Sequence, residues 1–238
     1  MDGHVSFGRV SLRYTPDADP ALVGVNFDVA PGEVIAILGG NGSGKSTILK
    51  LLLNMYTPQA GSIRIDHTDI RQLDPVELRQ MIGYVPQTTQ FFYGTLAQNL
   101  RLSNPAATDE ELEKACERAN LLEDIKALPK GFWTRIGEGT GGALPTSFQQ
   151  RLNLARCFLK KPKIMLFDEP GNGLDFDDDQ VFMKTVESFK EEGMCSFIVT
   201  HRPSHLRISD KVLWLENGHM KMYGPTDEVR PHIPKEFL

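Results

Sequence analysis

The sequence predicts an α/β fold with a mainly parallel sheet, and three observations support this class. A glycine-rich loop at 39–47 lies between an apolar run and a helical pattern. Two further apolar runs, 163–169 and 195–201, end in polar residues, which is typical of buried parallel strands. The segment 177–193 between them has helical spacing, so these three segments form a strand–helix–strand unit.

The N-terminal part of the chain is predicted to form strands. Residues 5–14 and 23–38 alternate apolar and polar side chains, and Pro31-Gly32 forms a turn within the second run. Residues 61–66 form a further short strand. The start of the chain is therefore rich in strand structure.

The middle of the chain, approximately 88–160, is predicted to be predominantly helical. Residues 108–122 begin with a threonine and early acids and continue with helical spacing, which indicates one helix. The later helix at 177–193 opens with three aspartates, which suit the positive end of a helix, and Gly193 closes it. We therefore expect a helical subdomain beside the strands.

Composition limits the class of protein. The chain has 238 residues, of which 40% are hydrophobic, and this favours one compound domain covering 1–238 with a substantial core. The longest apolar runs, 34–38 and 164–167, are far below the ~20 residues that a membrane-spanning helix requires. We expect the chain itself to be soluble, with no transmembrane domain within it.

Cysteine usage and charge narrow the setting further. Cys116, Cys157 and Cys195 are too scattered for a disulfide framework or a zinc site, which favours a reducing cytoplasmic environment. A net charge of -5 and a pI near 5.7 argue against a nucleic-acid partner, because phosphate neutralisation requires a basic surface. The densest basic run, 158–163, is interpreted as a solvated helix end before a buried strand.

Residues 39–47 match the phosphate-binding pattern G-x-x-x-x-G-K-[ST] in the expected strand–loop–helix context. Glycines let backbone N–H groups surround phosphates, and the following helix offers its positive N-terminus. Lys45 is expected to meet the β- and γ-phosphate oxygens, and the Ser46 hydroxyl to ligate Mg²⁺. ATP and Mg²⁺ are therefore the predicted cofactors. The candidate nucleotide-binding residues of this loop are Gly39, Asn41, Gly42, Ser43, Gly44, Lys45, Ser46 and Thr47.

Four further polar residues follow predicted strands and complete a candidate hydrolytic site. Asp168 is placed to hold Mg²⁺ through water, and Glu169 to polarise an attacking water. His201 is expected to hydrogen-bond the γ-phosphate or that water, and Gln87 to contact both Mg²⁺ and water. A histidine or glutamine at a strand end is usually structural when considered alone. All four are expected to converge on the sheet edge that carries the glycine-rich loop.

Taken together, these motifs resemble the nucleotide-binding domain of an ABC transporter across nearly the whole chain. Their order is the P-loop at 39–47, the Q-loop at Gln87, a signature region at 144–148, the Walker B strand ending at Asp168-Glu169, a D-loop at 171–175 containing Asp175, and an H-loop at His201. The resemblance implies that Tyr14 stacks on adenine. It also implies a P-loop, RecA-like core, an N-terminal antiparallel β subdomain and a helical subdomain.

Within this family, two segments look like those of exporters. Residues 134–140 resemble the exporter X-loop, and residues 84–100 resemble the segment around and after the exporter Q-loop. The sequences of these segments are similar to those of type I secretion and peptide exporters. In such proteins membrane helices normally precede the domain. The resemblance implies a transmembrane domain as partner, fused or separate, and a location at the cytoplasmic face of the bacterial inner membrane.

The signature region departs from the family pattern. ABC cassettes pair head to tail, so the signature of one chain is expected to close over the ATP of the other. The usual sequence is Leu-Ser-Gly-Gly-Gln, whereas the matching residues here are Leu144, Pro145, Thr146, Ser147 and Phe148. The proline removes a hydroxyl and an N–H, two hydroxyl side chains replace glycines, and phenylalanine replaces the amide. The helix that follows should persist, because proline is tolerated at a helix start.

The intact hydrolytic residues and the altered signature suggest two hypotheses. In the first, the chain works opposite a non-identical cassette, whose intact signature completes the site at this P-loop, while the site facing 144–148 turns over slowly. In the second, a homodimer tolerates the variant signature because Thr146 and Ser147 supply the lost hydrogen bonds. The D-loop, GNGLD, is richer in glycine than is usual, which leaves communication through Asp175 open.

Two other classes fit the sequence less well. A non-transport ABC ATPase for DNA repair or translation would carry long coiled coils, two cassettes or a basic face, and the sequence offers none of these. A module that senses ATP without hydrolysing it has no need of a positioned base such as Glu169.

Overall fold

The computed structural model describes residues 2–137, 144–171 and 174–237 of the chain. Among these residues ten strands form one large sheet in the order β5-β4-β1-β2-β12-β11-β3-β10-β9-β6. The strands are β1 (Val5–Leu12), β2 (Leu22–Val29), β3 (Val34–Leu38), β4 (Ala60–Ile65), β5 (Thr68–Asp69), β6 (Ile82–Val85), β9 (Ile164–Asp168), β10 (Cys195–Val199), β11 (Lys211–Glu216) and β12 (His219–Pro225).

The two halves of this sheet differ in strand direction and in burial. From β11 through β3, β10 and β9 to β6 every pairing is parallel. Strands β3 and β10 are buried at every residue, because both faces of a parallel sheet are covered. At the other end β1 pairs antiparallel with β2 and β4, and β2 alternates between buried and exposed residues near its end. The predicted α/β class and the N-terminal antiparallel region are therefore confirmed.

Successive residues of β9 join two different hydrophobic cores. Ile164 and Leu166 lie in a cluster with the antiparallel strands and with α1 (Lys45–Leu52). Met165 and Phe167 face the opposite way and join a cluster with α6 (Thr146–Lys160) and α7 (Phe176–Glu191). The sheet is thus held from both sides, and the site-bearing ends of its strands are anchored in packed layers.

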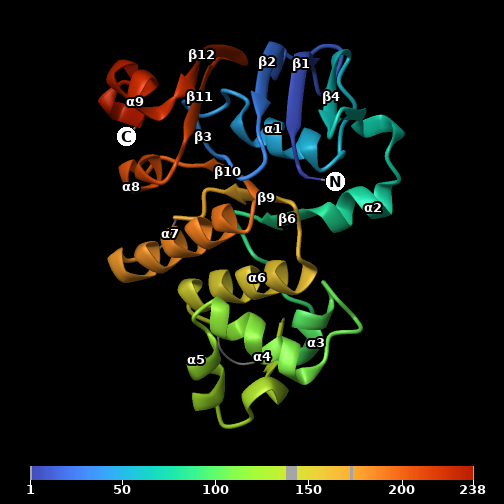
Figure 1. The fold of residues 1–238 in the computed structure, drawn as a ribbon, viewed down its shortest axis with the longest axis vertical. Coiled ribbons are helices and arrows are strands. Elements are labelled where there is room, and N and C mark those ends of the chain that lie inside the picture. Colours follow the sequence, from blue (N-terminus) through green and yellow to red (C-terminus); the bar gives the residue numbers. More distant parts are fainter. Residues whose placement is uncertain (1, 138–143, 172–173, 238) are drawn as a thin grey trace.

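The helical part lies on one side of the sheet, with α6 between the sheet and the remaining helices (Figure 1). Its other helices are α3 (Leu96–Arg101), α4 (Asp109–Arg118) and α5 (Leu122–Ala127). Helices α3 and α4 each begin with a capping box, formed by Thr95 with Gln98 and by Thr108 with Glu111. The remaining short helices are α2 (Pro75–Met81), α8 (Pro203–Arg207) and α9 (Thr226–Val229).

The helix predicted over 108–122 is present but shorter, because α4 ends at Arg118 and Leu122 already begins α5. Asn120 adopts a left-handed conformation with φ 52°, which ends α4. The amides of Asn120 and Leu121 then donate to the carbonyls of Glu117 and Cys116. This is a Schellman-type end, and asparagine tolerates the left-handed conformation that it requires.

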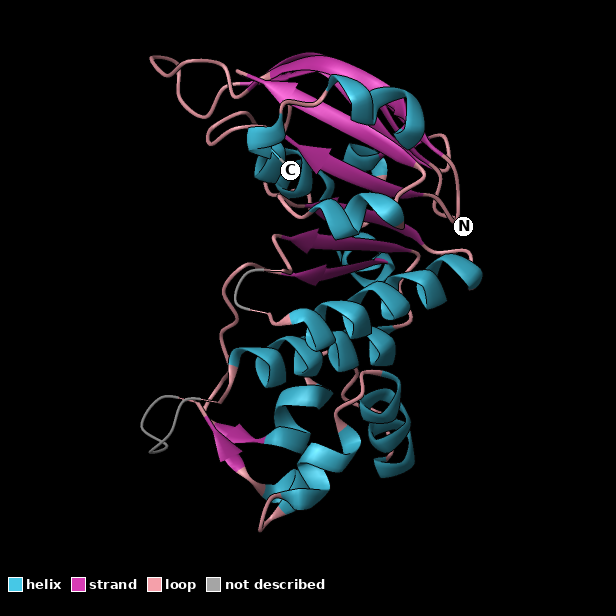
Figure 2. Ribbon diagram, turned by 90° about the vertical axis from the view of Figure 1, so that its left-hand side faces the viewer, coloured by secondary structure: helices cyan, strands magenta, loops and turns pink. Residues whose placement is uncertain are grey.

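A small two-stranded sheet interrupts the helical part. Strand β7 (Gly94–Thr95) pairs antiparallel with β8 (Arg135–Ile136), and Figure 2 shows this pair at the edge of the helical layer. The pairing brings the segment after Gln87 beside the segment that resembles the X-loop. The last residues of that X-loop resemblance, 138–140, lie outside the described residues, as do 172 and 173 of the D-loop.

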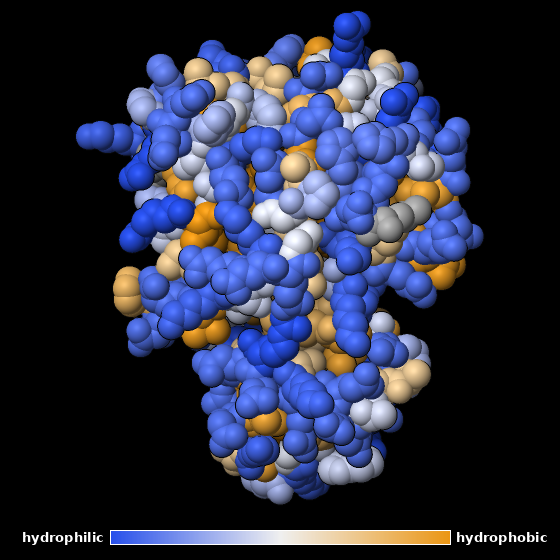
Figure 3. Space-filling view, viewed as in Figure 1, coloured by the Kyte–Doolittle hydropathy of each residue, from blue (hydrophilic) through white to orange (hydrophobic). Residues whose placement is uncertain are grey.

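Hydrophilic side chains cover most of the face seen in Figure 3, with separate hydrophobic patches between them. Within the described ranges, no helix combines the length and the apolar character needed to cross a membrane.

Candidate nucleotide site

The glycine-rich loop joins β3 to α1 and takes its shape from three glycines with positive φ. A Cβ at Gly39 would lie 2.3 Å from the Leu215 carbonyl oxygen, and one at Gly44 would lie 2.6 Å from that of Ala21. A Cβ at Gly42 would meet no atom within 4 Å, although its φ of 74° still favours glycine. The loop is therefore pressed against neighbouring backbone at two points and open at Gly42, as a phosphate cradle requires.

Lys45 fastens this loop from within. Its Nζ donates hydrogen bonds of 2.8 Å to the carbonyl oxygens of Gly39 and Gly40, and the residue is 6% exposed. Burial lowers the pKa of Lys45, while the nearby carboxylates of Glu169 and Asp168 act to raise it. Within the described chain, the buried Ser43 Oγ has no hydrogen-bond partner, so the loop also holds a polar atom suited to a ligand.

Ser46 and Asp168 meet at the first turn of α1. The Ser46 hydroxyl donates to Asp168 Oδ1 over 3.1 Å. Burial raises the pKa of Asp168, and the hydrogen bond from Ser46 opposes that rise. A hydroxyl and a carboxylate this close, with the Gln87 side chain on the adjacent strand end, are oxygen donors of the kind that Mg²⁺ prefers. The residues present therefore fit a magnesium ion.

Glu169 connects the ends of three adjacent strands. Its Oε2 accepts a 3.0 Å hydrogen bond from Gln87 Nε2, beyond the end of β6. Its Oε1 lies 3.5 Å from His201 Nε2, beyond the end of β10. Glu169 itself has a φ of 50°, and its amide donates to the Val199 carbonyl, which turns the chain at the end of β9. Gln87, Glu169 and His201 are thus brought together, as predicted from their places after the strands.

Tyr14 lies beside the first turn of α1. Its hydroxyl is 2.8 Å from Thr47 Oγ1, and its ring contacts the Tyr56 ring edge to face with centroids 4.9 Å apart. Lys50 Nζ lies 5.6 Å from the ring centroid, within range of a cation–π interaction. Tyr14 as a residue is 40% exposed, so part of it remains accessible to a ligand.

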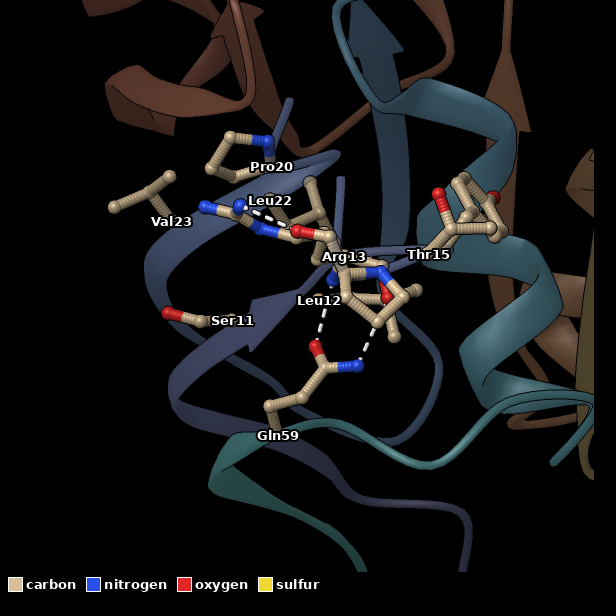
Figure 4. A pocket seen from close by; sticks show the side chains of 10 residues that line it. Ser11, Leu12, Arg13, Thr15, Pro20, Leu22, Val23 and Gln59 are labelled. Atoms are coloured by element: carbon tan, nitrogen blue, oxygen red, sulfur yellow. Dashed lines mark hydrogen bonds between the residues drawn. The ribbon is translucent and has the colours of Figure 1, made fainter. Parts of the chain in front are cut away.

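A cavity of about 550 Å³ adjoins Tyr14 and includes residues that sequence reasoning missed. Figure 4 shows Leu22 and Arg13 lining it, and Gln59 bridging the Arg13 backbone. The Gln59 side chain accepts from the Arg13 amide over 2.6 Å and donates to its carbonyl over 2.8 Å. This volume is in the range of small-molecule sites. Gln59 has no motif in the sequence that would have identified it.

The signature region forms the start of α6. Pro145 occupies the N-cap position and makes no side-chain capping hydrogen bond, so the helix does begin after a proline as predicted. Thr146 is exposed and Ser147 is half-buried. Phe148 is 6% exposed and packs in the helical core with Leu152. The Phe148 side chain therefore points into the domain, which its place in the motif did not reveal.

Asp175, the described aspartate of the D-loop, is the N-cap of α7. Its Oδ1 accepts a 2.9 Å hydrogen bond from the Asp178 amide. Capping of this kind stabilises a helix by about 1 kcal/mol. Asp175 thus has a structural partner within its own chain.

Comparisons with known proteins agree with this geometry. The family model described as "ABC transporter" matches residues 22–172. A mitochondrial iron-sulfur clusters transporter, ATM1 of Kluyveromyces lactis, is 41% identical over 221 residues, which are 92% of this chain and 30% of that protein. The exotoxin translocation ATP-binding protein PaxB of Pasteurella aerogenes is 34% identical over 96% of this chain and 32% of its own length.

A solved structure of a bacterial Atm1-family ABC exporter with ATP bound is similar over 99% of this chain and 41% of that chain, with a TM-score of 0.90 and 33% identity. The chain therefore spans less than half the length of these relatives. The family match and the arrangement of the P-loop with Asp168 and Glu169 agree. The chain belongs to the ABC transporter family, and the relatives that it matches include exporters.

Proposed function

We propose that this chain is the ATPase domain of an exporter, binding ATP with Mg²⁺ at the P-loop and hydrolysing it in a head-to-tail dimer. The observation that carries the proposal is the Glu169 carboxylate, held between Gln87 at 3.0 Å and His201 at 3.5 Å beside the Ser46–Asp168 pair. This arrangement places a proton acceptor next to a cation-binding cluster, and hydrolysis of a phosphoanhydride requires both.

Each polar group has a role in this proposal. Glu169 accepts a proton from the attacking water, and His201 and Gln87 orient its carboxylate, because each contacts a different oxygen. Ser46, Gln87 and Asp168 would hold Mg²⁺. When bound, this ion offsets the negative charge of the β- and γ-phosphates. Lys45 adds a positive charge under the same phosphates, since it is fixed at the base of the loop.

The base of ATP is proposed to bind beside Tyr14. Its accessible ring offers a stacking surface next to the cavity of about 550 Å³, and its hydroxyl ties the ring to Thr47 of the P-loop helix. Stacking on this ring would seat the adenine at one end of the cradle while the phosphates bind at the other.

Coupling to export is proposed to occur through an aromatic surface made of Phe92, Tyr93 and Trp133. These side chains are 69%, 64% and 76% exposed. The β7–β8 pairing joins their segments, and Arg135 Nη1 donates to the Tyr93 hydroxyl over 3.1 Å. Exposed aromatic groups of this kind mark interaction sites. A transmembrane domain, fused or separate, docking there would place the chain at the cytoplasmic face of a membrane.

We infer that the second cassette of the dimer is non-identical. The start of α6 offers Thr146 and Ser147 as its hydroxyl donors to a partner's ATP, while Pro145 has no N–H and Phe148 is buried. Losing one well-placed donor to the reacting phosphate costs ~2.7–4 kcal/mol of transition-state stabilisation. A homodimer in which the two hydroxyls compensate is the second candidate, and exposure of Thr146 favours it.

The deciding experiment compares ATP turnover by the chain alone with turnover in a mixture with a cassette that carries an intact Leu-Ser-Gly-Gly-Gln signature. We expect activity to rise steeply only in the mixture, and to vanish when this chain carries Glu169→Gln. Robust, cooperative turnover by the chain alone would contradict the heterodimer.

A matched variant separates the candidates further. Pro145→Ser with Thr146→Gly and Ser147→Gly should raise the activity of a homodimer, whereas it should leave this chain's own site in a mixed dimer unchanged.

A further inference from the structure

A buried polar network underlies the loop that carries His201. His205 is fully buried, and Thr200 and Asp179 are 2% and 4% exposed. His205 Nδ1 lies 2.7 Å from Thr200 Oγ1, and His205 Nε2 lies 2.8 Å from Asp179 Oδ1. Asp179 also accepts a 2.8 Å hydrogen bond from the Ser204 hydroxyl. Buried polar groups bonded in this way hold a local structure rigidly.

The protonation states in this network are mutually consistent. Burial acts to raise the pKa of Asp179, but bonds from Ser204 and His205 together with the charge of Arg202 outweigh it and lower that pKa. Burial lowers the pKa of His205. A neutral His205 can then donate from Nε2 to the Asp179 carboxylate and accept from Thr200 at Nδ1.

Arg202 connects this network to the loop that follows Glu169. Its Nη1 lies 3.1 Å from Asp179 Oδ1, while its Nη2 donates to the Leu174 carbonyl over 2.8 Å. The Arg202 amide donates to Thr200 Oγ1 over 3.0 Å. Arg202 directly follows His201, and Leu174 lies five residues after Glu169. One guanidinium therefore ties the loop after β10 to the loop after β9.

Gly171 gives Arg202 the room that this connection needs. A Cβ at position 171 would lie 2.5 Å from both Cδ and Nε of Arg202. Both atoms lead directly to the Nη atoms that contact Leu174 and Asp179, so moving them away from position 171 would disturb those contacts. A glycine at position 171, the first residue of the D-loop, therefore leaves room for the Arg202 side chain.

On the basis of the proposed hydrolytic function, we propose that Arg202 is a positioning residue for ATP hydrolysis. It fixes the loop that carries His201 against the loop that follows Glu169, and so maintains the 3.5 Å approach of these two side chains. An arginine is required at this position, because the two Nη atoms of its guanidinium contact two separate acceptors, Asp179 Oδ1 and the Leu174 carbonyl. Asp179 contacts the Arg202 guanidinium and Thr200 accepts from the Arg202 amide, while His205 contacts both of these residues. Gly171 leaves space for the arginine.

The test is a double-mutant cycle on Arg202→Ala and Gly171→Ala, measured in whichever assembly gives turnover. Each single variant should lower kcat by about 10- to 100-fold, since small misplacements of reacting groups have effects of this size. The KM for ATP should stay within about twofold, because the P-loop and Tyr14 are not touched. The double variant should be no slower than Arg202→Ala alone, because the clash disappears with the side chain.

Two further variants keep the result interpretable if Arg202→Ala folds poorly. Arg202→Lys retains the charge but not the fork, so it should fold while remaining slow. Arg207→Ala removes an exposed arginine from the same segment and should match the wild type. Unchanged kcat in Arg202→Lys and Arg202→Ala, or additive losses in the double variant, would overturn the proposal. Full turnover by Glu169→Gln would instead count against the hydrolytic function, whatever the Arg202 variants do.

Discussion

The carboxyl edge of the parallel strands and the N-terminus of α6 are built very differently. At the strand edge, Glu169 contacts side chains from two neighbouring strand ends, and Asp168 is bonded by Ser46. At the start of α6, Pro145 provides no side-chain cap and Phe148 is buried. One region gathers polar side chains around two carboxylates, and the other mainly supports its own helix. In a head-to-tail dimer these regions would serve different ATP molecules, so the two sites would be unequal wherever the partner carries a different signature.

The largest expected effect is at the carboxyl edge of the parallel strands, where Gln87, Asp168, Glu169 and His201 lie. We call this region the reactive edge. Glu169→Gln keeps the size of the side chain but replaces one acceptor oxygen with an NH2 group and removes the proton acceptor, so turnover should fall by about 10²- to 10⁴-fold. ATP binding should persist, because the P-loop contacts are unchanged. Phosphate release measures the turnover, and nucleotide titration measures the ATP binding.

Glu187→Gln, on the exposed side of α7, is the control and should match the wild type. If Glu169→Gln retained full turnover, Glu169 would not be the proton acceptor, and the proposed chemical difference between the strand edge and the start of α6 would be wrong.

The second prediction concerns the opposite region and the stability of the fold. Phe148→Gln would restore the family's amide, but it places a polar group in the helical core, where an unsatisfied amide costs about 1–3 kcal/mol in addition to the lost packing. The free energy of unfolding should therefore drop by several kcal/mol, measured by urea denaturation. Thr146→Gln, at an exposed position, is the matched control and should change it little. Unaltered stability in Phe148→Gln would mean that this side chain does not anchor α6.

A third prediction separates base recognition from phosphate binding at the reactive site. Tyr14→Ala should raise the Kd for ATP by about two- to tenfold, since an aromatic stacking partner contributes about 0.5–1.5 kcal/mol. Tyr14→Phe should retain most of the affinity, and binding of inorganic tripolyphosphate should not respond to either change. Tyr93→Ala serves as the control for an exposed tyrosine elsewhere. Equal losses for ATP and tripolyphosphate would place Tyr14 in the phosphate cradle instead.

The smallest expected effect is a pH dependence beneath the reactive edge. Burial lowers the pKa of His205, so below the ordinary value near 6.5 the unfolded chain takes up a proton that the folded chain does not. Stability should therefore fall as pH decreases from about 7 to 5, with a slope of at most about 1.4 kcal/mol per pH unit. His205→Gln should flatten this slope, whereas the exposed His232→Gln should not. Thermal unfolding across this pH range measures the slope of stability against pH. An identical slope in His205→Gln would contradict the attribution of this pH dependence to His205.

Much of the fold followed from local patterns in the sequence. The continuous apolar runs of β9 and β10 and the alternating N-terminal strands were predicted because burial on one or two faces leaves a direct imprint on residue order. The helix break at Asn120 was missed, since helical spacing continues across it and a left-handed asparagine has only a weak sequence signal. The β7–β8 pair was missed because two-residue strands carry almost no periodicity.

The sequence by itself determined which chemical groups the protein carries, because the P-loop pattern and the carboxylates at the end of β9 act through adjacent residues of the chain. Only the tertiary structure decided which distant groups meet. Strand order and register place Gln87 and His201 on the two oxygens of Glu169, core packing turns Phe148 inward, and the path of Arg202 explains Gly171. The physical reason is that such contacts depend on how whole layers pack, and residue spacing along one segment does not record that packing.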